Sequence, residues 1–84
     1  MMATPAREVD IRDYRVYPSM DPKRIGKRDV VITYFIGAEG PFSTIVPYEE
    51  LEGRPLEIQL EIVKKYIAKE QDERLKFIGR KFTL

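Results

Sequence analysis

The segment Asp29–Ile36 constrains the fold of this chain more than any other feature of the sequence. Seven of its eight residues are β-branched or aromatic, which are the residue types that favour strands. Both alternating sets of side chains along it are largely apolar, as in a strand that is covered on both faces. The sequence therefore predicts a central β-strand here.

Two neighbouring strands are predicted beside this central one. In residues 9–17 the apolar positions change phase part of the way along, so we expect a bulge or bend near Arg12 and Asp13. Residues 37–40 contain two glycines that suit a short turn, and Pro41 then opens the next strand, where its missing N–H does least harm. Residues 42–46 are therefore predicted to pair antiparallel with the central strand.

The second half of the chain begins with a predicted helix over residues 55–72. Pro55 suits a helix start, and the apolar residues that follow recur at helical spacing. They form a stripe that is expected to face the sheet, made of Leu56, Leu60, Val63 and Ile67. Residues 75–84 return to an alternating pattern typical of a strand, with Gly79 interpreted as a bulge.

These elements predict a small α+β fold in the order β-β-β-α-β. One mostly antiparallel sheet carries one helix on one face, and residues 1–84 form a single domain, of which residues 1–7 are expected to be disordered. The element order resembles that of integrase-arm and AP2-type DNA-binding domains. The resemblance is limited to element order, and no residue motif accompanies it.

The residue inventory argues against catalysis. The 84 residues include no cysteine and no histidine, which excludes thiolate nucleophiles, imidazole bases and the common zinc sites. No serine or lysine has an identifiable base beside it, and so short a chain leaves little room for an enclosed pocket. Three carboxylates, Glu49, Glu50 and Glu52, are explained by their place before a helix. We expect no enzyme activity, cofactor or metal.

The predicted helix has a second apolar stripe, which needs a cover. This stripe consists of Ile58, Ile62 and Tyr66, about 120° around the helix from the first. One interpretation is that the long connection 18–26 folds over it with Met20 and Ile25. The other is that the stripe is an oligomer interface, which a second copy of the chain or a different protein covers.

Basic residues give an alternative hypothesis, which is binding to the phosphates of DNA or RNA. The net charge of +1 gives no general attraction to polyanions, but residues 29–53 hold five acidic and no basic groups, so the charge is segmented. If the first and last strands are neighbours, the cations form one surface. Solvated loop charges and edge-strand cations that oppose aggregation explain the same residues without a ligand. The candidates are Arg12, Arg15, Lys23, Arg24, Lys27, Arg28, Arg80 and Lys81.

The leading hypothesis is a small intracellular interaction module, a homodimeric adaptor or accessory subunit that binds itself or another protein. No apolar run approaches the length that crosses a membrane, so we expect a soluble, cytoplasmic protein without a membrane partner. The chain has no asparagine and only two glutamines, a bias typical of thermophile proteins.

Overall fold

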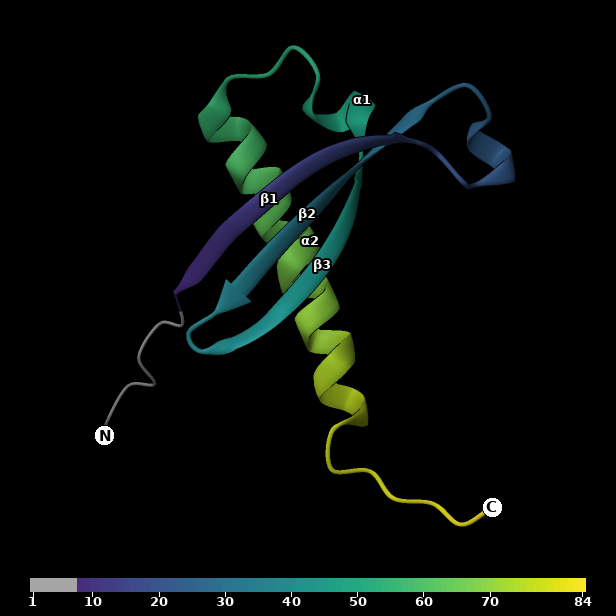
Figure 1. Ribbon diagram of the computed structural model, residues 1–84, viewed down its shortest axis with the longest axis vertical. Coiled ribbons are helices and arrows are strands. Elements are labelled where there is room, and N and C mark those ends of the chain that lie inside the picture. Colours follow the sequence, from purple (N-terminus) through teal and green to yellow (C-terminus); the bar gives the residue numbers. More distant parts are fainter. Residues whose placement is uncertain (1–7) are drawn as a thin grey trace.

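The computed structural model describes residues 8–84, and they form three strands followed by a long helix (Figure 1). The strands form one antiparallel sheet in the order β1-β2-β3, which confirms the small α+β class. The expectation of disorder in residues 1–7 falls outside the described residues. Among the described helices none is long and apolar enough to cross a membrane. The elements are β1 (Val9–Pro18), the 3-10 turn η1 (Pro22–Arg24), β2 (Arg28–Ile36), β3 (Glu39–Pro47), α1 (Tyr48–Leu51) and α2 (Leu56–Phe77).

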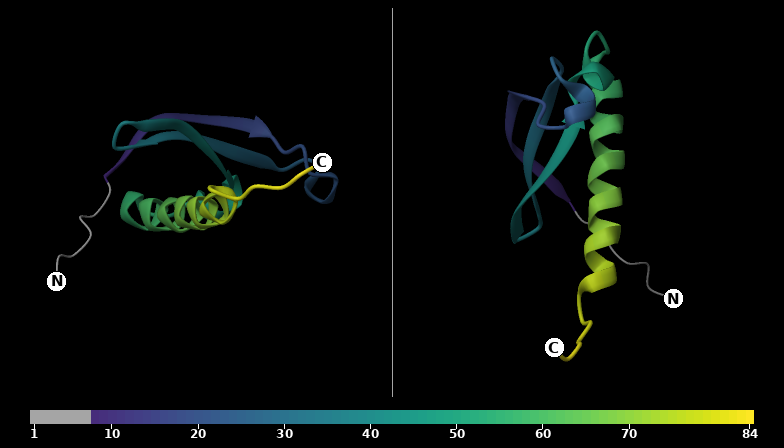
Figure 2. Two further views of the ribbon diagram at one scale, coloured as in Figure 1. Left: turned by 90° about the horizontal axis from the view of Figure 1, so that it is seen from below. Right: turned by 90° about the vertical axis from the view of Figure 1, so that its right-hand side faces the viewer.

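The central position predicted for residues 29–36 is confirmed, because β2 pairs with β1 on one side and with β3 on the other. Figure 2 shows α2 lying against one face of the sheet. The side chains of β2 on that face are the centre of the core and are all buried, namely Val30, Ile32, Tyr34 and Ile36. On the opposite face the side chains of β2 are only half-buried, so the second cover expected there is partial.

The bulge predicted in the first strand is also confirmed. The register of β1 against β2 shifts between Ile11 and Asp13, which leaves Arg12 without a partner residue. The shift brings the two halves of the strand into the same phase, as a one-residue bulge does. Four apolar side chains consequently lie opposite buried residues of β2, on the sheet face that carries α2, namely Val9, Ile11, Tyr14 and Val16.

The helix covers the sheet unevenly. Val63 and Ile67 are buried against it, and the later part of α2 leans on β2 and β3, where the Gln71 amide donates a 3.0 Å hydrogen bond to the hydroxyl of Tyr34. In contrast, Leu56 and Leu60 keep 69% and 47% of their surface exposed. The prediction that the whole first stripe faces the core is therefore wrong for these two leucines, since α2 crosses the sheet and its first turns pass beyond β1 (Figure 1).

The predicted final strand over residues 75–84 is not formed. The helix continues to Phe77, since Glu73, Arg74, Leu75 and Lys76 are all good helix formers. Gly79, interpreted from the sequence as a bulge, instead ends the helix with a positive φ of 83°, the usual role of glycine just past a helix C-terminus. Residues 78–84 then run on without a strand partner among the described residues.

The long connection between β1 and β2 does not cover the second apolar stripe of the helix. It carries η1, whose first turn is capped by the Asp21 carboxylate accepting from the backbone N–H of Lys23. Met20 and Ile25 are 92% and 84% exposed, so neither packs on α2. The interpretation in which these two side chains fold over the helix is therefore wrong.

Candidate functional site

An exposed apolar groove lies between β1 and the first half of α2. It consists of two hollows of about 240 and 190 Å³, and both are lined by Ile11, Leu60 and Val63. We name it the β1–α2 groove. Its exposed apolar side chains retain between 41% and 69% of their surface and are Val9, Ile11, Tyr14, Leu56 and Leu60.

The groove is open because of how α2 lies on the sheet. The later part of the helix is drawn toward β3, where the Arg74 guanidinium lies 4.8 Å from the centre of the Phe42 ring and 3.9 Å from a carboxylate oxygen of Glu39. The bulge in β1 meanwhile directs an unbroken row of apolar side chains at the helix. Within residues 8–84, β1 pairs with β2 alone, so its other edge also presents unpaired backbone groups.

The stripe predicted from the sequence as an oligomer interface lies on the other flank of α2. Ile62 and Tyr66 pack partly against the core beside α1, and of the three stripe residues only Ile58, at 44%, is exposed. The Tyr66 hydroxyl donates to the Glu50 carboxylate. Burial, together with this carboxylate, raises the pKa of Tyr66 to about 12. The three stripe residues line a hollow of about 490 Å³, which is more polar than the β1–α2 groove because Glu50, Arg54, Glu61 and Lys65 also line it.

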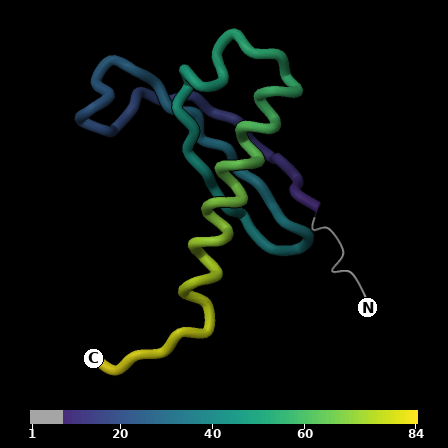
Figure 3. Tube along the Cα trace, turned by 180° about the vertical axis from the view of Figure 1, so that it is seen from behind, coloured from purple at the N-terminus to yellow at the C-terminus, as the bar shows by residue number. Residues whose placement is uncertain are grey.

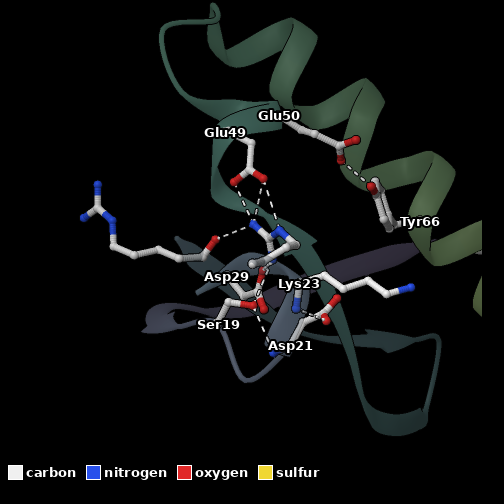
Figure 4. A network of polar contacts seen from close by, with 9 residues as sticks. Ser19, Asp21, Lys23, Asp29, Glu49, Glu50 and Tyr66 are labelled. Carbon is white, nitrogen blue, oxygen red and sulfur yellow. Dashed lines mark hydrogen bonds and ion pairs between the residues drawn. The ribbon is translucent and has the colours of Figure 1, made fainter. Parts of the chain in front are cut away.

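A polar network joins the long connection to α1 (Figure 4). Most of its hydrogen bonds come from Arg24. Its guanidinium donates to the Asp29 carboxylate, to both oxygens of Glu49 at 2.7 and 2.8 Å, and to the Ser19 hydroxyl at 3.1 Å. The hydrogen bonds that Arg24 donates lower the pKa of Asp29 and of Glu49, and those to Glu49 raise the pKa of Arg24 itself. Arg24 is a structural clamp whose donors are already occupied.

The two arginines of β1 are also engaged within the chain. Arg12 donates to Asp10 at 2.6 Å and lies 5.0 Å from the centre of the Phe35 ring, and Arg15 donates to Asp13 at 2.8 Å. Both pairs are exposed and lie on the face of the sheet opposite α2. They leave β1 with neighbouring charges of both signs, as on an ordinary solvated strand face.

The structure does not gather the remaining candidate cations into one surface. Arg80 and Lys81 follow the end of α2 instead of lying on a strand beside β1, and the Arg80 side chain donates to the carbonyl of Lys76. Arg28 stacks on the Tyr48 ring at 4.2 Å. Two exposed lysines remain in the long connection, Lys23 and Lys27.

The acidic residues after β3 have partners in the fold. Glu49 accepts from Arg24 and Glu50 accepts from Tyr66, and both residues lie in the short helix α1. Among the described residues, no group of three or more carboxylates is arranged to hold a metal ion.

Sequence reasoning missed the β1–α2 groove, although it identified the feature that builds it. The phase change in residues 9–17 predicts that both halves of the strand face one way, and this places four apolar side chains on one side of an edge strand. What the sequence does not contain is the crossing angle of α2, which decides whether those side chains are covered.

Comparison with known proteins found no match. The chain matches no protein-family model, no curated protein and no solved structure.

Proposed function

We propose that this chain is a small, non-enzymatic protein-interaction module that self-associates as a homodimer and acts as an adaptor or accessory subunit. The observation that carries the proposal is the β1–α2 groove, an apolar surface next to an unpaired sheet edge. Apolar patches of this kind on small proteins mark places where another macromolecule binds.

The free energy of burying the exposed leucines favours a covered groove. Full burial of a leucine side chain contributes about 1.5–3 kcal/mol, so covering the exposed parts of Leu56 and Leu60 is worth roughly 2–3 kcal/mol. A domain of this size has a net stability of only about 5–10 kcal/mol. An edge strand with an apolar flank is also a template for pairing with another chain. Self-association would bury the two leucines and pair the free edge of β1.

The nucleic-acid alternative has less support, because its cations are dispersed and mostly engaged. Arg12, Arg15 and Arg24 each donate to carboxylates, and Arg80 and Lys81 lie beyond the end of α2. Binding through phosphates would weaken steeply as salt rises, since each neutralised phosphate releases counterions. The dimer of this proposal is held by apolar contacts and should persist at high salt.

Sedimentation equilibrium of matched glutamate variants tests the proposal. Leu56→Glu places a charge in the groove, at a helix N-terminus where a negative charge does not harm folding. We expect it to weaken dimerisation at least tenfold, the equivalent of about 1.4 kcal/mol. Ile25→Glu, in the exposed connection, is the control and should dimerise like the wild type.

A third variant shows which flank of α2 forms the dimer interface, the groove or the second apolar stripe. Ile58→Glu lies in the same first turn as Leu56 but on the stripe predicted from the sequence, so its effect on helix stability is comparable. We expect this variant to remain dimeric. If Ile58→Glu dissociates the dimer and Leu56→Glu does not, the stripe is the interface and the groove assignment fails. A wild type that stays monomeric at every concentration overturns the proposal.

A further inference from the structure

The last ten residues of the chain form a second exposed apolar feature, which we name the C-terminal arm (residues 75–84). It consists of the final turn of α2 and the seven residues after it, and it leaves the body of the fold beyond the sheet (Figures 1 and 3). Its large apolar side chains are between 53% and 111% exposed, namely Leu75, Phe77, Ile78, Phe82 and Leu84. Ile78, Phe82 and Leu84 also share one phase of a strand.

The β1–α2 groove has space for one more strand. The first turns of α2 lie beyond the free edge of β1 in Figures 1 and 3, where Leu56 and Leu60 are exposed. A strand added along that edge would therefore receive backbone hydrogen bonds from β1 and an apolar cover from these two leucines. Strand addition of this kind is a common way for sheets to bind an extended segment.

We propose that the C-terminal arm of one copy adds as a strand to the free edge of β1 in a second copy, with its apolar side chains in the β1–α2 groove. The exchange is reciprocal in a two-fold dimer, so both grooves and both arms are buried. This inference rests on the self-association proposed above and names the contacts that produce it.

The arm cannot fill the groove of its own chain. Ile67 lines the groove beside Val9, and the ten helical residues from there to Phe77 carry the chain about 15 Å away. The seven residues 78–84 span at most about 23 Å when extended. A return to β1 would use most of that length and leave about two residues to pair with a ten-residue strand. If the arm fills a groove, it is therefore the groove of a second copy.

The exposed area agrees with a stable dimer. The five groove side chains and the five arm side chains retain 41–111% of their surface. With about 150–200 Å² for a fully exposed large side chain, they offer on the order of 1,000 Å² of side-chain surface per copy. Stable interfaces bury about 800 Å² per partner. The two features together suffice for a specific dimer, whereas either one alone does not.

Disulfide trapping tests the proposed pairing of the arm with β1 directly, and no natural cysteine interferes because the sequence has none. One variant carries Asp13→Cys on β1 and another carries Thr83→Cys in the arm, and the two full-length proteins are mixed and oxidised mildly. We expect a cross-link between positions 13 and 83 to dominate over 13–13 and 83–83 links, as identified by mass spectrometry. A dominant 13–13 link, or no link at all, overturns the inference.

A point variant separates this inference from the proposed function. Phe82→Asp changes a side chain that is 84% exposed in the arm, so the fold of the single chain should be unaffected. We expect the dimer dissociation constant to rise at least tenfold, with Ile25→Asp as the exposed control. If Phe82→Asp dimerises like the wild type, the arm is not the occupant although self-association stands. If the wild type itself is monomeric, both proposals fail.

Discussion

Both terminal nitrogens of the Arg24 guanidinium are committed to carboxylates, and one of them binds both oxygens of Glu49 at 2.7 and 2.8 Å. This contact ties the connection between β1 and β2 to α1, 25 residues later in the chain. It also explains why residues 23–28, which include four cations, do not offer four free charges. The loop is folded around its own arginine.

Replacing Arg24 should destabilise the fold in a pH-dependent way. Arg24→Met leaves the Asp29 and Glu49 carboxylates without their main partner, so the free energy of unfolding should fall at pH 7. Arg24 lowers the pKa of both carboxylates below their ordinary values of 3.8 and 4.5. Its contribution is therefore fully present above about pH 5 and is lost as the pH falls through the lowered values.

The measurement is urea denaturation of both proteins between pH 7 and pH 2.5, with Lys23→Met as a control that removes a neighbouring exposed charge. We expect the difference in unfolding free energy between the wild type and Arg24→Met to be constant down to about pH 5 and to become smaller below it. A difference in unfolding free energy that does not change with pH would contradict the stabilising role of Arg24.

Tyr66 should titrate apart from an exposed tyrosine. Burial and the Glu50 carboxylate raise its pKa to about 12, from an ordinary 10.0. Because the folded state holds this proton more tightly than the unfolded state, stability is unaffected below pH 10 and falls as the pH rises from 10 towards 12. Ultraviolet titration should show a delayed phenol transition that Tyr66→Phe removes, whereas the control substitution Tyr17→Phe, at an exposed position, should leave it in place.

The two halves of the first helix stripe should respond differently to truncation. Ile67→Ala removes a buried side chain and should cost about 2–4 kcal/mol of unfolding free energy. Leu56→Ala changes a side chain that is 69% exposed and should cost less than about 1 kcal/mol in dilute monomer. Urea denaturation at low protein concentration distinguishes them, and equal costs would mean that the whole stripe is packed.

Gly40 should be the least replaceable of the turn glycines. Its φ of 134° is unfavourable for other residues, and an added Cβ would lie 2.8 Å from the Phe35 ring and 3.2 Å from the carbonyl oxygen of Tyr34. Gly40→Ala should therefore cost about 2–3 kcal/mol, and Gly26→Ala, where nothing lies within 4 Å, about 1 kcal/mol. Thermal unfolding followed by circular dichroism compares the two.

Local pattern predicted most of the fold, and the failures are instructive. The composition of residues 29–36 and the phase change near Arg12 determine their local structure, so β2 and the bulge in β1 were predictable. The final strand was not, because an alternating pattern after residue 75 competed with good helix formers and with Gly79 as a helix terminator.

The candidate site was harder to predict, because it depends on tertiary geometry. Helical spacing correctly places Leu56 and Leu60 on the same side as Val63 and Ile67, but it does not say where the sheet ends beneath them. In the same way, a count of cations cannot reveal that Arg24 is enclosed by Asp29 and Glu49. Both outcomes depend on contacts between segments far apart in sequence.

Hydrogen exchange of the β1 amides across a dilution series tests the central claim most directly, because it observes the free edge and its association together. If β1 pairs with another copy, its amides should exchange more slowly as the protein concentration rises, with Leu56→Glu abolishing the effect. Amides of β1 that exchange at the same rate at every concentration would contradict self-association through the β1–α2 groove.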